Sequence, residues 1–249
     1  MENISPTTSF RRGAIEPMVC LREGWALIQD QYWIFVGMSL VAMLLGSFVP
    51  LGILLGPMMC GIYLAIFKRR RGEPVEFGIL FKGFDYFGES VIASLIHYIP
   101  LMVIIIAFYV FFYGGFILIM VSQGGSEPDP ASLFGFLVVM IVAVLVLIVV
   151  ILLISLVFTF SYPLIVDRRL SGLEAVKLSA RASLANFWSL FALLLLNGLL
   201  ASAGALLCYV GIFLAFPVTF AAIAKAYEQV FGLDAVKAPN LPPPPPSFN

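Results

Sequence analysis

Four polar residues of this chain lie within or beside long apolar stretches, where such groups are the first candidates for function. Asp85 and Glu89 are four residues apart, so on a helix they would share one face and form a carboxylate pair. His97, the only histidine, carries a ring that titrates near neutral pH. Asn197 is an amide inside an apolar run. The plainer expectation is structural: solvated carboxylates, a hydrogen-bonded histidine and an amide that joins two helices.

The motifs of common enzyme classes are absent from the sequence. It contains no H-E-x-x-H, no G-x-S-x-G and no P-loop. One histidine cannot supply a multi-histidine metal site, and the three scattered cysteines are typical of small apolar residues. We therefore expect no catalytic residue, no cofactor and no metal ion, and we predict that the protein is not an enzyme.

The composition indicates an integral membrane protein. Hydrophobic residues make up 61% of the 249 residues and charged residues only 11%, whereas soluble domains are about 25% charged. The 14 basic and 14 acidic residues cancel, so the balance of charge does not suggest a nucleic-acid partner. The elements that position the polar residues should therefore be membrane-spanning helices.

Six apolar runs are long enough to be such helices, since a span needs about 17–25 residues. We predict spans at residues 32–49, 51–67, 91–121, 132–162, 187–203 and 206–224. The third and fourth runs exceed what a bilayer requires, so they must tilt, kink or project into water. Pro100 and the pair Gly114–Gly115 are the places where the third span could break.

The basic residues predict the orientation, because cytoplasmic loops are enriched in lysine and arginine. All 14 fall on one side of a six-span arrangement, which places both termini in the cytoplasm. The cluster Lys68, Arg69, Arg70 and Arg71 follows the second predicted span and is a candidate contact for anionic lipids. The simpler interpretation of this cluster is that it only fixes topology.

Each predicted pair of spans follows a short amphipathic stretch, at residues 15–33, 74–90 and 171–188, and the third stretch opens with the capping-box pattern S-x-x-E at Ser171 and Glu174. We therefore predict an all-α polytopic fold of three hairpins, each preceded by a cytoplasmic interfacial helix. Residues 1–14 should form a disordered N-terminus, residues 15–232 the membrane domain, and residues 233–249 a disordered proline-rich tail. Pro242 to Pro246 in this tail could bind a cytosolic protein.

Several segments carry a family resemblance: FKGFDYFGES, YPLIVDRRLSGLEAVKLSARASLANFW and AFPVTFAAIAKAYEQVFG. Over residues 15–232 the chain resembles a family of uncharacterised six-span bacterial inner-membrane proteins. These are loosely similar to the membrane domain found beside glycerophosphodiester phosphodiesterases. The resemblance implies a location in the bacterial cytoplasmic membrane, and it supplies no catalytic residues.

Three functions follow from these observations, the third being an enzyme that acts on lipids, for which Asp85, Glu89 and His97 are the only plausible group. The first is a non-catalytic membrane protein, either an assembly or accessory subunit or an envelope-homeostasis factor, with membrane lipids and another membrane protein as partners. The alternative is a transporter, channel or lipid scramblase. That alternative needs a polar path, for which the candidates are Ser94, His97, Ser155, Thr159, Asn197 and Thr219.

Overall fold

The computed structural model describes residues 10–48, 53–122, 124, 129–205 and 210–232. Over these ranges the chain is helical and contains no strand. The helices are α1 (Pro17–Ile28), α2 (Tyr32–Phe48), α3 (Leu55–Arg70), α4 (Phe87–Ser122), α5 (Pro130–Phe158), α6 (Ser161–Arg168), α7 (Gly172–Ala185), α8 (Phe187–Ala205) and α9 (Val210–Phe231). Two 3₁₀ helices, η2 (Gln29–Gln31) and η4 (Phe77–Tyr86), precede α2 and α4. The prediction of an all-α protein is confirmed for this part of the chain.

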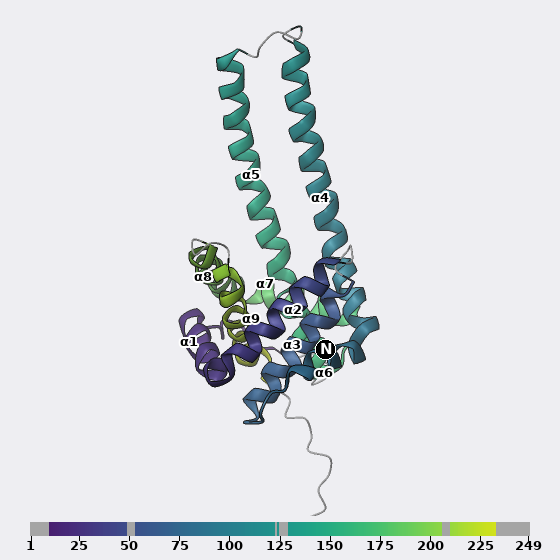
Figure 1. Cartoon of the computed structure of the whole chain (residues 1–249), viewed down its shortest axis with the longest axis vertical. Helices are drawn as coiled ribbons and strands as arrows, with labels where there is room; N and C mark the ends of the chain where they lie inside the picture. The colour runs from purple at the N-terminus through teal and green to yellow at the C-terminus, as the bar shows by residue number, and fades with distance from the viewer. Residues whose placement is uncertain (1–9, 49–52, 123, 125–128, 206–209, 233–249) are drawn as a thin grey trace, which may run out of the picture.

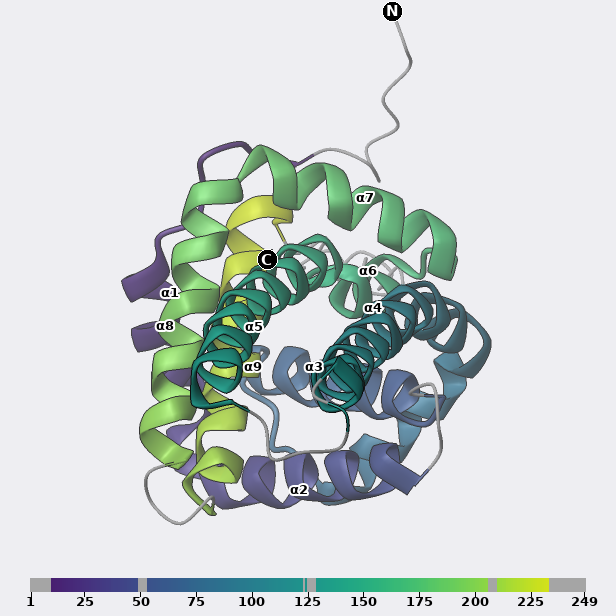
Figure 2. The same ribbon diagram turned by 90° about the horizontal axis from the view of Figure 1, so that it is seen from above.

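The helices α4 and α5 rise together out of a body formed by the other helices (Figure 1). Seen along the axis of this pair, α2, α7 and α8 lie lengthwise around it (Figure 2). At 1.5 Å per residue, α4 is about 54 Å long and α5 about 44 Å, against about 30 Å for the hydrocarbon core of a bilayer. The excess length that the sequence predicted for these two runs is therefore present.

Within the described residues, five helical stretches are long and apolar enough to cross a membrane. They include α2, α4, α5, α8 and α9, which match five of the six predicted spans. The second predicted span corresponds to α3, which has only 16 residues and ends in Lys68, Arg69 and Arg70. The structure thus supports a multi-pass membrane protein without establishing that α3 is a sixth span.

Two predictions about continuity were wrong. First, α4 runs unbroken through Pro100 and Gly114–Gly115, because the helices of membrane proteins tolerate proline where neighbouring groups satisfy the backbone. Second, the run predicted at 132–162 is interrupted: α5 ends at Phe158 and α6 begins at Ser161. The Ser179 hydroxyl of α7 donates to Val157 O at 2.7 Å and accepts from Phe160 N at 3.1 Å, which satisfies the backbone at this break.

The three predicted amphipathic stretches are helical, as α1, η4 and α7. Each packs on a helix from another predicted hairpin. Helix α1 lies on α9, where Gly24 contacts the backbone of Ala221 and Ala222. Likewise η4 lies on α3, where Gly83 contacts the backbone of Pro57 and Gly61, and α7 bonds to the end of α5 through Ser179. The first predicted unit thus contacts the third, the second contacts the first, and the third contacts the second, so the three units form a closed ring.

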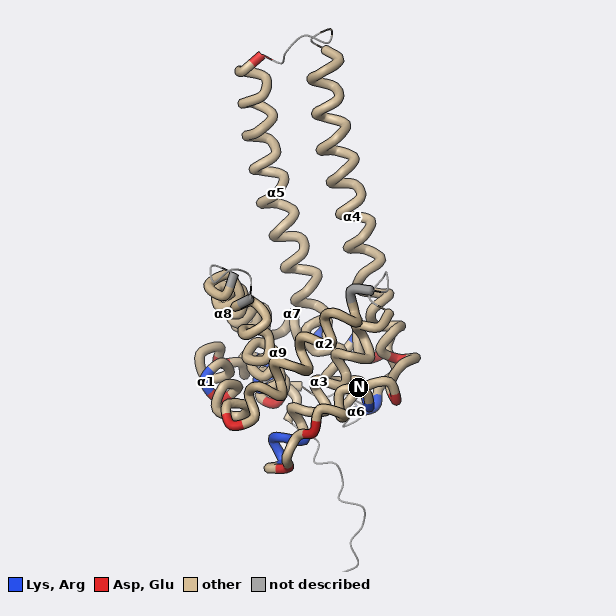
Figure 3. Tube along the Cα trace, viewed as in Figure 1, with Lys and Arg blue, Asp and Glu red and all other residues tan. Residues whose placement is uncertain are grey.

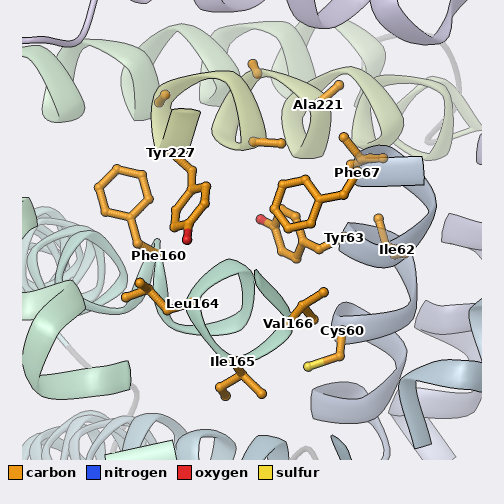
Figure 4. Packing of buried hydrophobic residues seen from close by; sticks show 14 of the residues in the cluster. Cys60, Ile62, Tyr63, Phe67, Phe160, Leu164, Ile165, Val166, Ala221 and Tyr227 are labelled. Carbon is orange, nitrogen blue, oxygen red and sulfur yellow. The ribbon is translucent and has the colours of Figure 1, made fainter. Parts of the chain in front are cut away.

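Helices α3, α6 and α9 share the centre of the body (Figure 4). Tyr227 of α9 is fully buried, and its ring lies 5.9 Å from that of Phe67 and 6.3 Å from that of Phe160. Its hydroxyl donates to the Asp167 carboxylate at 2.6 Å. Aromatic and aliphatic side chains therefore pack these helices together, and the Tyr227–Asp167 hydrogen bond links α9 to α6.

Candidate functional site: a charged pocket beside η4

The two predicted carboxylates line one pocket of about 460 Å³. Asp85, Tyr86, Gly88 and Glu89 come from the end of η4 and the first turn of α4. Ile165, Arg169 and Leu170 come from the end of α6 and the turn that follows it. The volume falls within the range of about 300–1,000 Å³ that is usual for small-molecule sites.

Glu89 is held in place by the start of α7. Its Oε2 atom accepts a hydrogen bond from the backbone N–H of Gly172 at 2.6 Å. A side chain at position 172 would crowd Ile92, whose Cβ lies 3.0 Å from the place of the added carbon, so glycine permits this approach. The N-terminus of a helix also favours a negative charge. The Glu89 Oε1 atom accepts no hydrogen bond from the described residues.

The turn before α7 is built by local hydrogen bonds. Ser171 accepts from Glu174 N at 3.4 Å, and its own hydroxyl donates to the Glu174 carboxylate at 2.7 Å, which confirms the predicted capping box. The hydrogen bonds from the Ser171 side chain and backbone lower the pKa of Glu174. Arg169, two residues earlier, adopts the left-handed conformation with φ of 50°, which ends α6 and turns the chain past the pocket.

The pocket carries positive and negative side chains that do not form ion pairs with one another. Asp85 and Arg169 are exposed. In the described part of the chain, no ion pair within 4 Å joins Arg169 to Asp85 or Glu89. Two carboxylates and one guanidinium therefore face solvent around one cavity. In the sequence, Arg169 is one of the 14 basic residues that predict the orientation, and nothing in its spacing connects it with Asp85.

His97 does not join this group, since it is not among the residues that line the pocket. Eight residues of helix separate it from Glu89, a rise of about 12 Å. Its ring stacks on Phe158 of α5 with centroids 4.4 Å apart and on Tyr98 at 4.9 Å. Among the described residues, neither ring nitrogen has a hydrogen-bond partner. The only set of residues considered for a lipid-directed enzyme is therefore not assembled.

Asn197 lies in α8 and is 6% exposed. Neither its amide nitrogen nor its amide oxygen has a hydrogen-bond partner within the described ranges. It lines neither this pocket nor a second one between the N-terminal segment and α7. The expectation that Asn197 hydrogen-bonds to another helix is therefore not met by the residues that the structure describes.

The predicted basic cluster is largely neutralised inside the protein. Arg69 pairs with Asp30, Arg70 Nε lies 3.0 Å from Glu228 Oε1, and Arg71 Nε lies 2.8 Å from Glu73 Oε1. The hydrogen bond from Arg71 lowers the pKa of Glu73. The Arg69–Asp30 pair joins α3 to η2, and the Arg70–Glu228 pair joins α3 to α9. These two pairs therefore brace the body. Lys68 alone has no such partner among the described residues.

The polar residues proposed for a transport path are mostly bonded locally. The Thr159 hydroxyl donates to Ser155 O at 3.0 Å and the Thr219 hydroxyl to Phe216 O at 2.8 Å. The Ser94 and Tyr162 hydroxyls lie 3.0 Å apart. Neither of the two pockets is lined by any of these residues.

A second pocket of about 570 Å³ lies between the N-terminal segment and α7, lined by Phe10, Arg12, Arg181, Leu184 and Ala185. Of the described residues, no group of three or more His, Cys, Asp or Glu side chains could hold a metal ion. Charged residues gather on the body, and beyond the first turn of α4, which carries Glu89, the described part of the α4–α5 pair shows a red residue only near its tip (Figure 3).

Comparison of the chain with protein-family models, with curated proteins and with solved structures found no match.

Proposed function

We propose that this chain is a non-catalytic multi-pass membrane protein that serves as an assembly or accessory subunit for a different membrane protein. The observation that carries the proposal is the bare end of the α4–α5 pair. No residue of α4 after Leu101 is buried, and Met140 and Leu156 are the only buried residues of α5. A stable protein rarely leaves so large an apolar surface without a lipid or protein to cover it.

The length of the pair indicates that lipid covers only part of this surface. Tyr109 and Tyr113 are exposed and lie 20 and 24 residues beyond Glu89. At 1.5 Å per residue these distances are about 30 Å and 36 Å, so the tyrosines fall where the far interface of a bilayer would lie. Tyrosine is enriched at such interfaces. We therefore place the bilayer between Glu89 and these tyrosines.

An apolar tip then extends beyond the bilayer. It consists of residues 114–122 of α4 and 130–138 of α5. Leu118 is 69% exposed and Phe134 68% exposed, and similar side chains surround them. Beyond the bilayer these apolar side chains would be exposed to water. We therefore infer that a partner protein covers them at the far side of the membrane. Strong tilting would instead draw the tip back into lipid.

The orientation belongs to the same proposal. We place both termini and the basic residues at the cytoplasmic face of the bacterial inner membrane, with six spans that include α3. The support is the confinement of basic residues to one side of the predicted spans. Replacing Lys68, Arg69, Arg70 and Arg71 by glutamine should disturb this topology, as measured by the accessibility of single cysteines in the tip. Unchanged labelling would contradict the assigned orientation.

Photo-crosslinking in native membranes tests the partner. A photoreactive amino acid at Leu118 or Phe134 should crosslink to a distinct protein, which mass spectrometry would identify. The matched control is Ile106, which is 52% exposed on the same helix but lies within the inferred bilayer and should crosslink to lipid. Lipid adducts alone at Leu118 and Phe134, or crosslinks only to a second copy of this chain, would refute the proposal.

A further inference from the structure

The pocket beside η4 presents two carboxylates and a guanidinium that are not paired with one another. We propose that it binds the zwitterionic headgroup of an aminophospholipid, such as phosphatidylethanolamine. In this assignment the primary ammonium lies at Asp85 and Glu89, and the phosphodiester lies at Arg169.

The hydrogen-bond donors and acceptors of the pocket match those of this headgroup. A primary ammonium has three N–H donors, and ionised carboxylates are acceptors only. Glu89 Oε1 is available because Gly172 N binds the other oxygen. Arg169 offers the planar fork of N–H donors that matches phosphate oxygens. A purely anionic ligand would meet two like charges, and a purely cationic one would leave the guanidinium unused.

The surroundings place the pocket at the level of lipid headgroups. Phe81, Phe84 and Phe87 are 47%, 38% and 43% exposed on η4 and the start of α4, around Asp85. The rings of Phe84 and Phe87 stack with centroids 6.2 Å apart. Exposed aromatic side chains beside charged groups are typical of helices that lie at the membrane interface. Exposed apolar side chains therefore lie on the same elements as the charged residues of the pocket.

The entrance also offers a path for acyl chains. A side chain at Gly88 would meet no atom within 4 Å, so this part of the rim is open. Ile92, one turn further into α4, is 44% exposed, and the apolar length of α4 continues beyond it. A bound headgroup would thus leave its acyl chains along α4, in the direction of the bilayer interior.

A binding experiment on the purified full chain in detergent tests the assignment. Short-chain phosphatidylethanolamine, phosphatidylcholine and phosphatidylglycerol would each be titrated and followed by native mass spectrometry. Phosphatidylethanolamine should bind at least about tenfold more tightly than the other two, because choline has no N–H donor and glycerol has no cation. Equal affinity for the three lipids, or no saturable binding, would overturn the proposal.

Two variants locate the site. Asp85→Asn should reduce the preference for phosphatidylethanolamine over phosphatidylglycerol about tenfold, and Arg169→Gln should weaken phosphatidylethanolamine and phosphatidylcholine alike. Lys82→Gln is the control, because Lys82 is exposed on η4 but does not line the pocket. A wild-type preference in Asp85→Asn, or wild-type affinities in Arg169→Gln, would refute the assignment. Soluble phosphoethanolamine should bind much more weakly than the lipid, and equal affinity would exclude a membrane lipid as the ligand.

Discussion

Gly24 offers a direct test of the contact between α1 and α9. A Cβ atom at this position would lie 2.8 Å from Ala222 N and 2.9 Å from the carbonyl carbon of Ala221. Both are backbone atoms of α9, so no side chain can rotate away. Ordinary contact begins at 3.4 Å, so in Gly24→Ala helix α1 would have to retreat by about 0.6 Å.

That retreat would strain the hydrogen bonds that hold the N-terminal segment to α9. Arg11 N donates to Val230 O at 2.7 Å, and Glu16 N donates to Gln229 Oε1 at 3.0 Å. Overpacking of this kind typically costs about 1–3 kcal/mol. The equilibrium constant for unfolding of Gly24→Ala should therefore rise about 5- to 160-fold, and Gly24→Val should rise further.

The free energy of unfolding can be measured in mixed micelles by titration with a denaturing detergent, with helicity followed by circular dichroism. The matched control is Gly198→Ala in α8, where an added Cβ meets no atom within 4 Å. It should be as stable as the wild type or up to about 1 kcal/mol more stable, because alanine favours a helix interior over glycine. If Gly24→Ala is as stable as Gly198→Ala, the close approach of α1 and α9 is refuted.

Three further predictions concern polar groups. Ser171→Ala removes the N-cap of α7 and should lower the free energy of unfolding by about 1 kcal/mol. Because the pKa of Glu174 is lowered in the folded state, the stabilisation from this carboxylate should be present at neutral pH and lost as the pH falls through its folded pKa. A free energy of unfolding that does not fall in acid would contradict this. Asn197→Leu should fold as well as the wild type or better, because a buried amide that has no partner within the described ranges is replaced by an apolar group of similar size; failure to accumulate in membranes would reveal a partner for the amide. A double-mutant cycle with Arg70→Gln and Glu228→Gln should give a coupling energy of about 0.5–1 kcal/mol, and additive effects would show that the pair adds nothing.

The helices and their ends were largely predictable from sequence because apolar runs and breakers are local signals. The starts of α2 at Tyr32 and of α8 at Phe187 coincide with the predicted spans. The capping box at Ser171 was also predicted from four consecutive residues. Such features depend on residues that are neighbours in the chain.

Other departures involve contacts between distant segments. The break after Phe158 depends on the Ser179 hydroxyl from α7, which no local pattern reveals. The pairing of Arg70 with Glu228 depends on α3 and α9 meeting in the body. For the candidate site, sequence predicted the carboxylates Asp85 and Glu89 but could not connect them with Arg169, which reaches them only through the α6–α7 turn.

The packing of α1 on α9 has a consequence for biosynthesis. About 200 residues separate Gly24 from Ala221, so a ribosome that adds about 5–20 residues per second completes α9 about 10–40 seconds after α1. During this interval the face of α1 that carries Cys20, Gly24 and Ile28, all buried in the finished protein, has not yet met α9, its main partner. The nascent chain must therefore shelter this face against the membrane surface or a chaperone. Chains truncated before α9 should consequently be recognised and degraded, even though every earlier helix has been synthesised.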